Sequence, residues 1–61
     1  MAIDKTTLIK LFNGYGLDYI KQIDTKVFKV YDAQLDQYAL VEYGYDRYLG
    51  YTIVSYTRVG V

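Results

Sequence analysis

The chain has 61 residues, and its seven basic and seven acidic residues give a formal net charge of zero at pH 7. The pI near 6.0 argues against nucleic-acid binding driven mainly by electrostatic attraction, because domains that bind nucleic acid are typically basic, with a pI above about 9. Cysteine and histidine are both absent, which excludes a disulfide framework, a thiolate zinc site and the commonest metal-binding side chain.

A chain this short lies near the lower size limit of a stable domain. Since disulfides and the usual structural metal sites are ruled out, we expect oligomerisation or a partner to support one small domain spanning residues 1–61. A secretory signal needs roughly 7 to 15 uninterrupted apolar residues, and charged or polar residues such as Asp4, Lys10 and Asn13 break every candidate run. The sequence therefore predicts a cytoplasmic protein with no membrane partner.

The first predicted element is a helix that begins after Asp4 and stops at residues 13–14. Asp4 is a plausible N-cap, because its side chain can accept hydrogen bonds from the free amides of the first turn. Leu8, Leu11 and Phe12 recur at spacings of three and four, which places them on one helical face. Asn13 and Gly14 tolerate the left-handed conformation found at helix C-termini.

Residues 15–24 fit two patterns. Leu17, Ile20 and Ile23 lie three apart, as in a short amphipathic helix, whereas an alternation through Tyr19 and Lys21 is typical of a strand. We favour a short second helix, with the strand as the alternative.

Three strands are predicted after this segment. Residues 27–31 are rich in β-branched and aromatic side chains, and strand character returns in residues 38–45 and 48–61. The connections are short, and parallel neighbours would need a crossover of about a dozen residues or more. The predicted fold is α+β: an N-terminal helix, with a second short helix in the favoured version, packed on a three-stranded antiparallel β-meander.

Alternation along the strands predicts the faces of this sheet. If Tyr31 lies opposite Tyr38, the face better suited to the core carries Phe28, Val30, Ala39, Val41 and Tyr43. The opposite face carries Val27, Lys29, Leu40 and Glu42.

Catalytic chemistry has little support in this composition. Most carboxylates fall in predicted turns or caps, and the only serine, Ser55, has no histidine to activate it. Asp32 and Asp36 share a loop, but turn formation explains them better than a weak cation site. We expect no catalytic residue, no metal and no cofactor.

Nine tyrosines are the compositional outlier. A purely structural explanation of the high tyrosine content is that tyrosine suits half-buried strands. The functional interpretation is a contact surface, because tyrosine and arginine are enriched where proteins bind one another. The predicted partner-binding residues cluster around the second hairpin, with one further arginine near it: Tyr43, Tyr45, Arg47, Tyr48, Tyr51 and Arg58.

These features predict a small non-catalytic protein-binding module, of a size and composition that suit an inhibitor or adaptor of phage or mobile-element type. The long final strand, if it lies at the sheet edge, offers unpaired backbone groups to a protein partner or to a second copy in a homodimer. The alternative is a single-stranded nucleic-acid-binding protein that uses exposed tyrosines as stacking platforms. A basic patch at Lys21, Lys26 and Lys29 would serve it, but neighbouring aspartates offset that charge.

Overall fold

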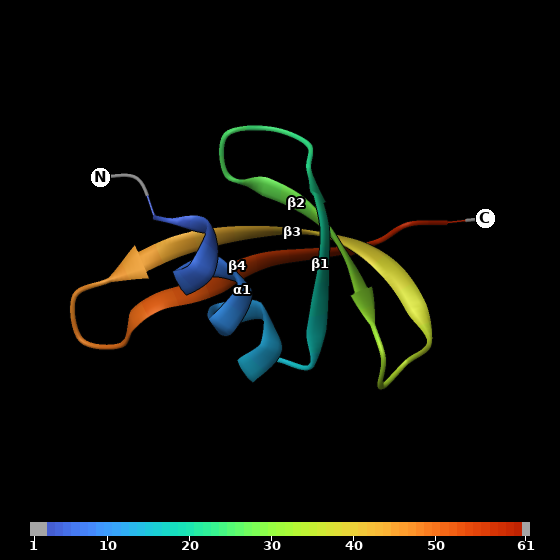
Figure 1. Cartoon of the computed structure of the whole chain (residues 1–61), viewed down its shortest axis with the longest axis horizontal. Coiled ribbons are helices and arrows are strands. Elements are labelled where there is room, and N and C mark those ends of the chain that lie inside the picture. Colours follow the sequence, from blue (N-terminus) through green and yellow to red (C-terminus); the bar gives the residue numbers. More distant parts are fainter. Residues whose placement is uncertain (1–2, 61) are drawn as a thin grey trace.

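The computed structural model describes residues 3–60, in which one helix precedes four strands. The elements are α1 (Lys5–Gly14), β1 (Leu17–Gln22), β2 (Val27–Asp32), β3 (Gln37–Asp46) and β4 (Gly50–Arg58). The strands form an open antiparallel sheet in the order β1-β2-β3-β4, as Figure 1 shows. The predicted α+β class and the antiparallel meander are confirmed, with one strand more than expected. No helix within residues 3–60 has the length and apolar character needed to cross a membrane.

Helix α1 begins and ends through local hydrogen bonds. The backbone amide of Thr7 donates to Asp4 Oδ1 at 2.7 Å, and this bond is the main reason that the pKa of Asp4 lies below its ordinary value. The predicted N-cap is confirmed. At the other end, the amides of Tyr15 and Gly16 donate to carbonyls of the last turn. The residue with left-handed backbone conformation after the helix is Gly16, with φ of 76°. It lies two positions beyond Gly14, the last residue for which the sequence predicts it.

The predicted second helix is wrong, because residues 17–22 form strand β1. Backbone pairing with β2, for example Tyr19 opposite Val30, supplies the hydrogen bonds that a helix would have made internally. The helical spacing of three apolar residues does not produce a buried face: Leu17 is buried, but Ile20 and Ile23 are exposed. Ile20 lies at a β-bulge, where the register shifts between Tyr19 and Lys21.

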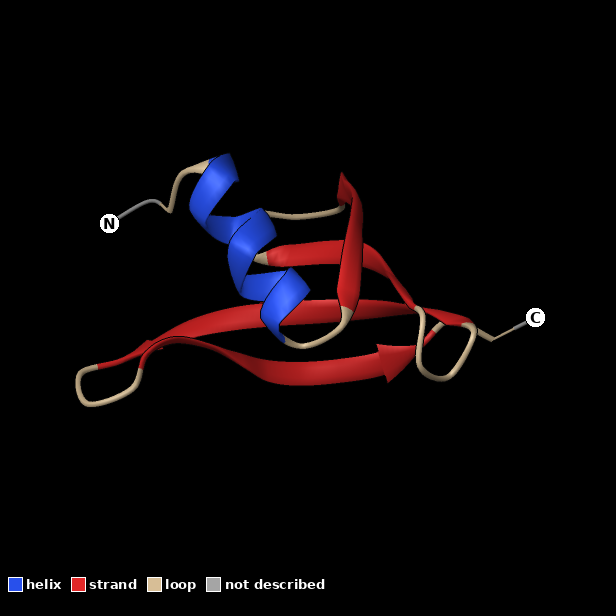
Figure 2. Cartoon of the chain, turned by 60° about the horizontal axis from the view of Figure 1, so that its bottom comes forward, coloured by secondary structure: helices blue, strands red, loops and turns tan. Residues whose placement is uncertain are grey.

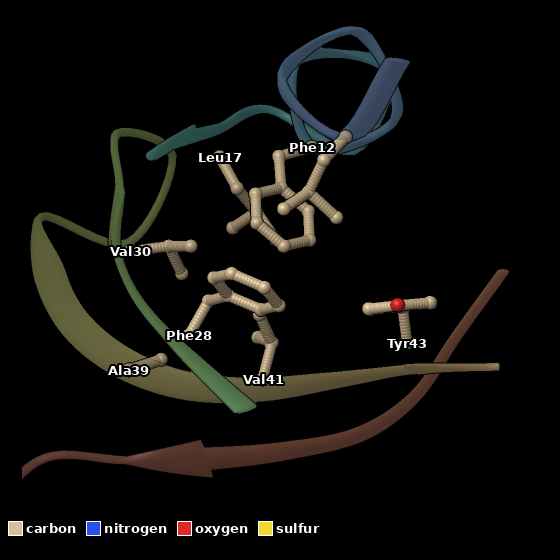
Figure 3. Packing of buried hydrophobic residues seen from close by; sticks show 8 residues of the cluster. Phe12, Leu17, Phe28, Val30, Ala39, Val41 and Tyr43 are labelled. Carbon is tan, nitrogen blue, oxygen red and sulfur yellow. The ribbon is translucent and has the colours of Figure 1, made fainter. Parts of the chain in front are cut away.

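The core lies between α1 and one face of the sheet (Figure 2). Tyr31 lies opposite Tyr38, which is the pairing on which the predicted faces depend. The strand residues expected on the core face are all buried: Phe28, Val30, Ala39, Val41 and Tyr43. Figure 3 shows Phe12 of α1 pointing toward Phe28, and their ring centres are 5.7 Å apart. We call this the inner face and the opposite one the outer face.

A second bulge bends the long β3–β4 hairpin. The register shifts after Glu42, opposite Ser55, so that Val54 has no partner before Tyr43 meets Ile53. Val54 lies over Gly44, where a Cβ atom would be only 2.9 Å from Val54 Cγ1. Gly44 therefore permits a close approach of the two strands that a side chain would block. The hairpin extends past α1 at the end opposite the C-terminus (Figures 1 and 2).

Candidate binding surface

The turn between β3 and β4 is held by the carboxylate of Asp46. Asp46 Oδ1 accepts hydrogen bonds from the backbone amides of Tyr48, at 2.7 Å, and Leu49, at 3.0 Å. Gly50 completes the turn with φ of 79°, a conformation that favours glycine. The hydrogen bonds between the Asp46 carboxylate and the backbone thus order the loop. Its large side chains are not needed for that purpose.

Those side chains form an exposed group that we call the hairpin tip: Tyr45, Arg47, Tyr48 and Leu49. The exposed fractions are 68% for Tyr45, 84% for Tyr48 and 77% for Leu49. The guanidinium carbon of Arg47 lies 5.3 Å from the centre of the Tyr48 ring, within the range of a cation–π contact. The tip therefore presents aromatic, aliphatic and cationic surface together.

The structure brings four of the six predicted partner-binding residues together. Tyr45, Arg47 and Tyr48 lie in the hairpin tip, and Tyr51 lies at its base opposite Tyr45. The Tyr45 and Tyr51 rings meet edge to face, with centres 5.1 Å apart. The predicted cluster thus exists at this end of the sheet.

The other two predicted residues lie elsewhere. Tyr43 is 7% exposed and belongs to the core, where its ring packs beside Phe28 and Tyr51. Arg58 is the last residue of β4, opposite Ala39, at the far end of the sheet from the tip. Strand alternation turns Tyr43 inward, and the length of β4 carries Arg58 away.

A row of aromatic rings connects the tip to the core. It runs through Tyr19, Phe28, Tyr43, Tyr51 and Tyr45, and neighbouring ring centres lie 5.8, 6.0, 6.0 and 5.1 Å apart. Such separations are typical of favourable aromatic contacts. The row joins residues of β1, β2, β3 and β4 into one strip on the inner face.

Two hollows lie along this row and together form what we call the groove. One, of about 480 Å³, is lined by residues of α1, the β1–β2 connection and the inner face: Ile3, Lys5, Leu8, Tyr19, Gln22, Thr25, Lys26, Phe28 and Tyr43. The other, of about 370 Å³, lies beside the hairpin and is lined by Lys26, Tyr43, Gly44, Tyr45 and Tyr51. Lys26 and Tyr43 line both hollows, so the groove continues from the helix to the hairpin.

Sequence reasoning missed the groove. Its wall includes Lys5 of α1 and Tyr19, and the favoured second helix would have placed Tyr19 differently. The ammonium of Lys5 lies 5.2 Å from the centre of the Tyr19 ring. Only the strand interpretation of residues 15–24 could have predicted this contact.

Strand β4 is an edge strand of the sheet. Its edge away from β3 pairs with no other strand among residues 3–60. The strand runs for nine residues, and from Val54 to Arg58 every residue is exposed. Beyond it, the Val59 amide still donates to the Tyr38 carbonyl at 2.9 Å, so β4 remains attached to β3 throughout. Its free side is an ordered row of backbone donors and acceptors.

The carboxylates of the β2–β3 turn are occupied by internal hydrogen bonds. Asp32 accepts from the backbone amides of Gln34 and Leu35 through Oδ1, and from the Tyr56 hydroxyl at 2.7 Å through Oδ2. Asp36 accepts from the Tyr31 hydroxyl. In the part of the chain that the structure describes, no three carboxylates gather closely enough to hold a metal ion. The turn assignment of Asp32 is confirmed, and its bond to Tyr56 adds a link to β4.

Comparisons of the chain with protein-family models, with curated proteins and with solved structures found no significant match.

Proposed function

We propose that this chain is a non-catalytic protein-binding module that recognises its partner with the hairpin tip. The observation that carries the proposal is the exposure of Tyr45, Tyr48 and Leu49 on a loop whose backbone is already ordered by Asp46. A loop whose backbone is already ordered loses less conformational freedom when a partner covers it, which favours binding. Tyrosine and arginine are also the residue types that dominate the binding energy of protein interfaces.

The free side of β4 supports the same role. An extended strand of a partner can add to an exposed sheet edge through main-chain hydrogen bonds, and β4 leads directly from the tip to Arg58. We propose that the tip supplies selectivity and the edge supplies additional area. An inhibitor or adaptor that covers part of its target's surface fits this arrangement.

The test is a triple variant in which Tyr45, Arg47 and Tyr48 are all changed to alanine. These side chains are exposed, so we expect the free energy of unfolding to change little and partner binding to be lost. The partner is first captured from a lysate of the native cells, identified by mass spectrometry and purified. Binding of the purified protein is then measured by calorimetry.

A matched control changes three other exposed residues of similar type, Tyr15, Lys10 and Leu35, to alanine. The control should bind like the unchanged chain. Equal binding by both triple variants would show that the tip is not the site. The nucleic-acid alternative is tested with oligothymidylate in place of the protein, and tight binding whose affinity falls steeply with salt, as counterion release from phosphates requires, would favour it.

The occupant of the β4 edge is decided by light scattering across the micromolar range. A mass that doubles with concentration would assign the edge to a second copy, as in a homodimer. A constant monomer mass would leave the edge to the partner protein.

A further inference from the structure

We propose that the groove binds an extended segment of the partner that carries acidic side chains next to a large apolar one. This inference rests on the proposed function, because it concerns the same partner, and it assigns that partner's chemistry.

The groove and the hairpin tip form one surface. Tyr45 belongs to the tip and also lines the hollow beside the hairpin. From there the groove continues past Tyr43 and Lys26 to the N-terminal end of α1. A partner held at the tip therefore has a direct path for an extended segment along the inner face.

The charged residues that line the two hollows are all basic, although Asp4 and Asp24 lie close to them in the sequence. The lining residues of both hollows include two lysines, Lys5 and Lys26, and no aspartate or glutamate, although the whole chain is formally neutral. Both lysines are exposed residues, so each adds the modest attraction of a surface charge. The groove therefore favours a segment with carboxylates and disfavours a basic one.

The floor of the larger hollow is apolar. Leu8, Phe28 and Tyr43 line it and are all buried residues of the core, with Ile3 packed against the same core. The volume of about 480 Å³ lies in the range of ligand-binding pockets, roughly 300 to 1,000 Å³. A leucine or aromatic side chain of the partner can enter it while flanking carboxylates meet the lysines.

The aromatic rings of the larger hollow favour a protein segment over single-stranded nucleic acid, although Tyr45 in the smaller hollow is 68% exposed. Base stacking needs a free ring face, but Phe28 and Tyr43 are almost fully buried and pack against each other. The Lys5 ammonium already lies over the Tyr19 ring. Two lysines are also few for tracking a phosphate backbone.

The test uses short fluorescent peptides of about six residues, a typical strand length. One contains aspartates around a central leucine and phenylalanine, a second replaces the aspartates with lysines, and oligothymidylate of similar length is the third probe. Amide chemical shifts of the chain are followed by NMR during titration. We expect the acidic peptide to shift Gln22, Thr25, Lys26 and Tyr43, and the basic peptide to shift none of them.

The decisive variant is Lys26→Glu, with Lys29→Glu as its matched control. Both make the same charge reversal, but Lys29 lies on the outer face, where its ammonium packs over Tyr38. We expect Lys26→Glu to weaken binding of the acidic peptide by about tenfold and Lys29→Glu to leave it nearly unchanged. Equal weakening by both, shifts confined to the outer face, or tighter binding of oligothymidylate would overturn the inference.

The two proposals fail in different ways. If the triple tip variant no longer binds the purified partner but Lys26→Glu still binds it, the groove inference is wrong and the proposed function stands. If the partner is retained by both variants, neither surface is the binding site.

Discussion

Asp32 and Asp46 make the same contact with the main chain in two different turns. In each, one carboxylate oxygen accepts from the backbone amides two and three residues later, which is the usual role of aspartate in turns. Their surroundings differ, because Asp32 is buried and its second oxygen accepts from Tyr56, whereas Asp46 is exposed. Asp32 therefore connects β4 to the β2–β3 turn as well as closing that turn.

We predict that Asp32→Ala destabilises the chain far more than Asp46→Ala. Removing the buried acceptor leaves the Tyr56 hydroxyl and two amides without their partner, at a cost of about 1 to 3 kcal/mol in the free energy of unfolding. At Asp46, water replaces the carboxylate. Urea denaturation of the two variants measures the difference, and equal losses would show that burial and the Tyr56 bond add nothing to the turn.

At the scale of the elements, the bulge in the β3–β4 hairpin depends on Gly44. The position at which a Cβ atom would stand is 2.9 Å from Val54 Cγ1 and 3.6 Å from Cγ2. Valine is stiff about χ1, so the strand must move to relieve such a contact. Gly44 thus sets how the hairpin bends and where it carries the tip.

Gly44→Ala is accordingly predicted to lower the free energy of unfolding by about 1 kcal/mol or more, as overpacking does. Gly14→Ala serves as the control, since no heavy atom lies within 4 Å of its Cβ position and alanine is the better helix former. Adding Val54→Ala to Gly44→Ala should restore most of the lost stability. Thermal denaturation of the four chains checks this, and no rescue in the double variant would contradict the proposed clash.

Over the whole molecule, two tyrosine hydroxyls connect the sheet to the carboxylates of the β2–β3 turn. The hydrogen bond to Asp36, with desolvation and nearby negative charge, raises the pKa of Tyr31 above its ordinary value of 10.0. For Tyr56, the amide of Gln37 lowers the pKa, but the hydrogen bond to Asp32 and desolvation outweigh it, and the net pKa is raised above 10.0. Both hydroxyls hold their protons more tightly in the folded chain.

Stability should therefore fall at alkaline pH. The contribution of each hydroxyl is complete below pH 10, the unfolded value, and is lost as the pH rises through the higher folded pKa. Urea denaturation from pH 8 upward should show this fall, and the Tyr31→Phe and Tyr56→Phe double variant should show a shallower one. Tyr45→Phe, in the exposed tip, is the control. Equal slopes in all three chains would contradict the role of these bonds.

The sequence alone was sufficient for the helix, for β2 and β3 and for the buried face between them, because those features depend on local signals. Asp4 caps the helix through its own first turn, and alternation along β2 and β3 places Phe28 and Val41 inside whenever Tyr31 meets Tyr38. The interruption at Asp46 could also be predicted, since its turn is local, but the final strand begins at Gly50 and not at residue 48, so Tyr48 lies in the turn. No distant contact is needed for any of these.

Only the tertiary structure decided the nature of β1, the place of Arg58 and the groove, whereas alternation along β3 already predicts Tyr43 on the core face. Helical spacing in residues 15–24 competes with a strand, and pairing with β2 gives the strand because that pairing satisfies the backbone of both segments. The same pairing carries Tyr19 to Lys5 and the aromatic row. A groove requires α1, the β1–β2 connection and the hairpin to meet in space, and no local pattern of residues determines such a meeting.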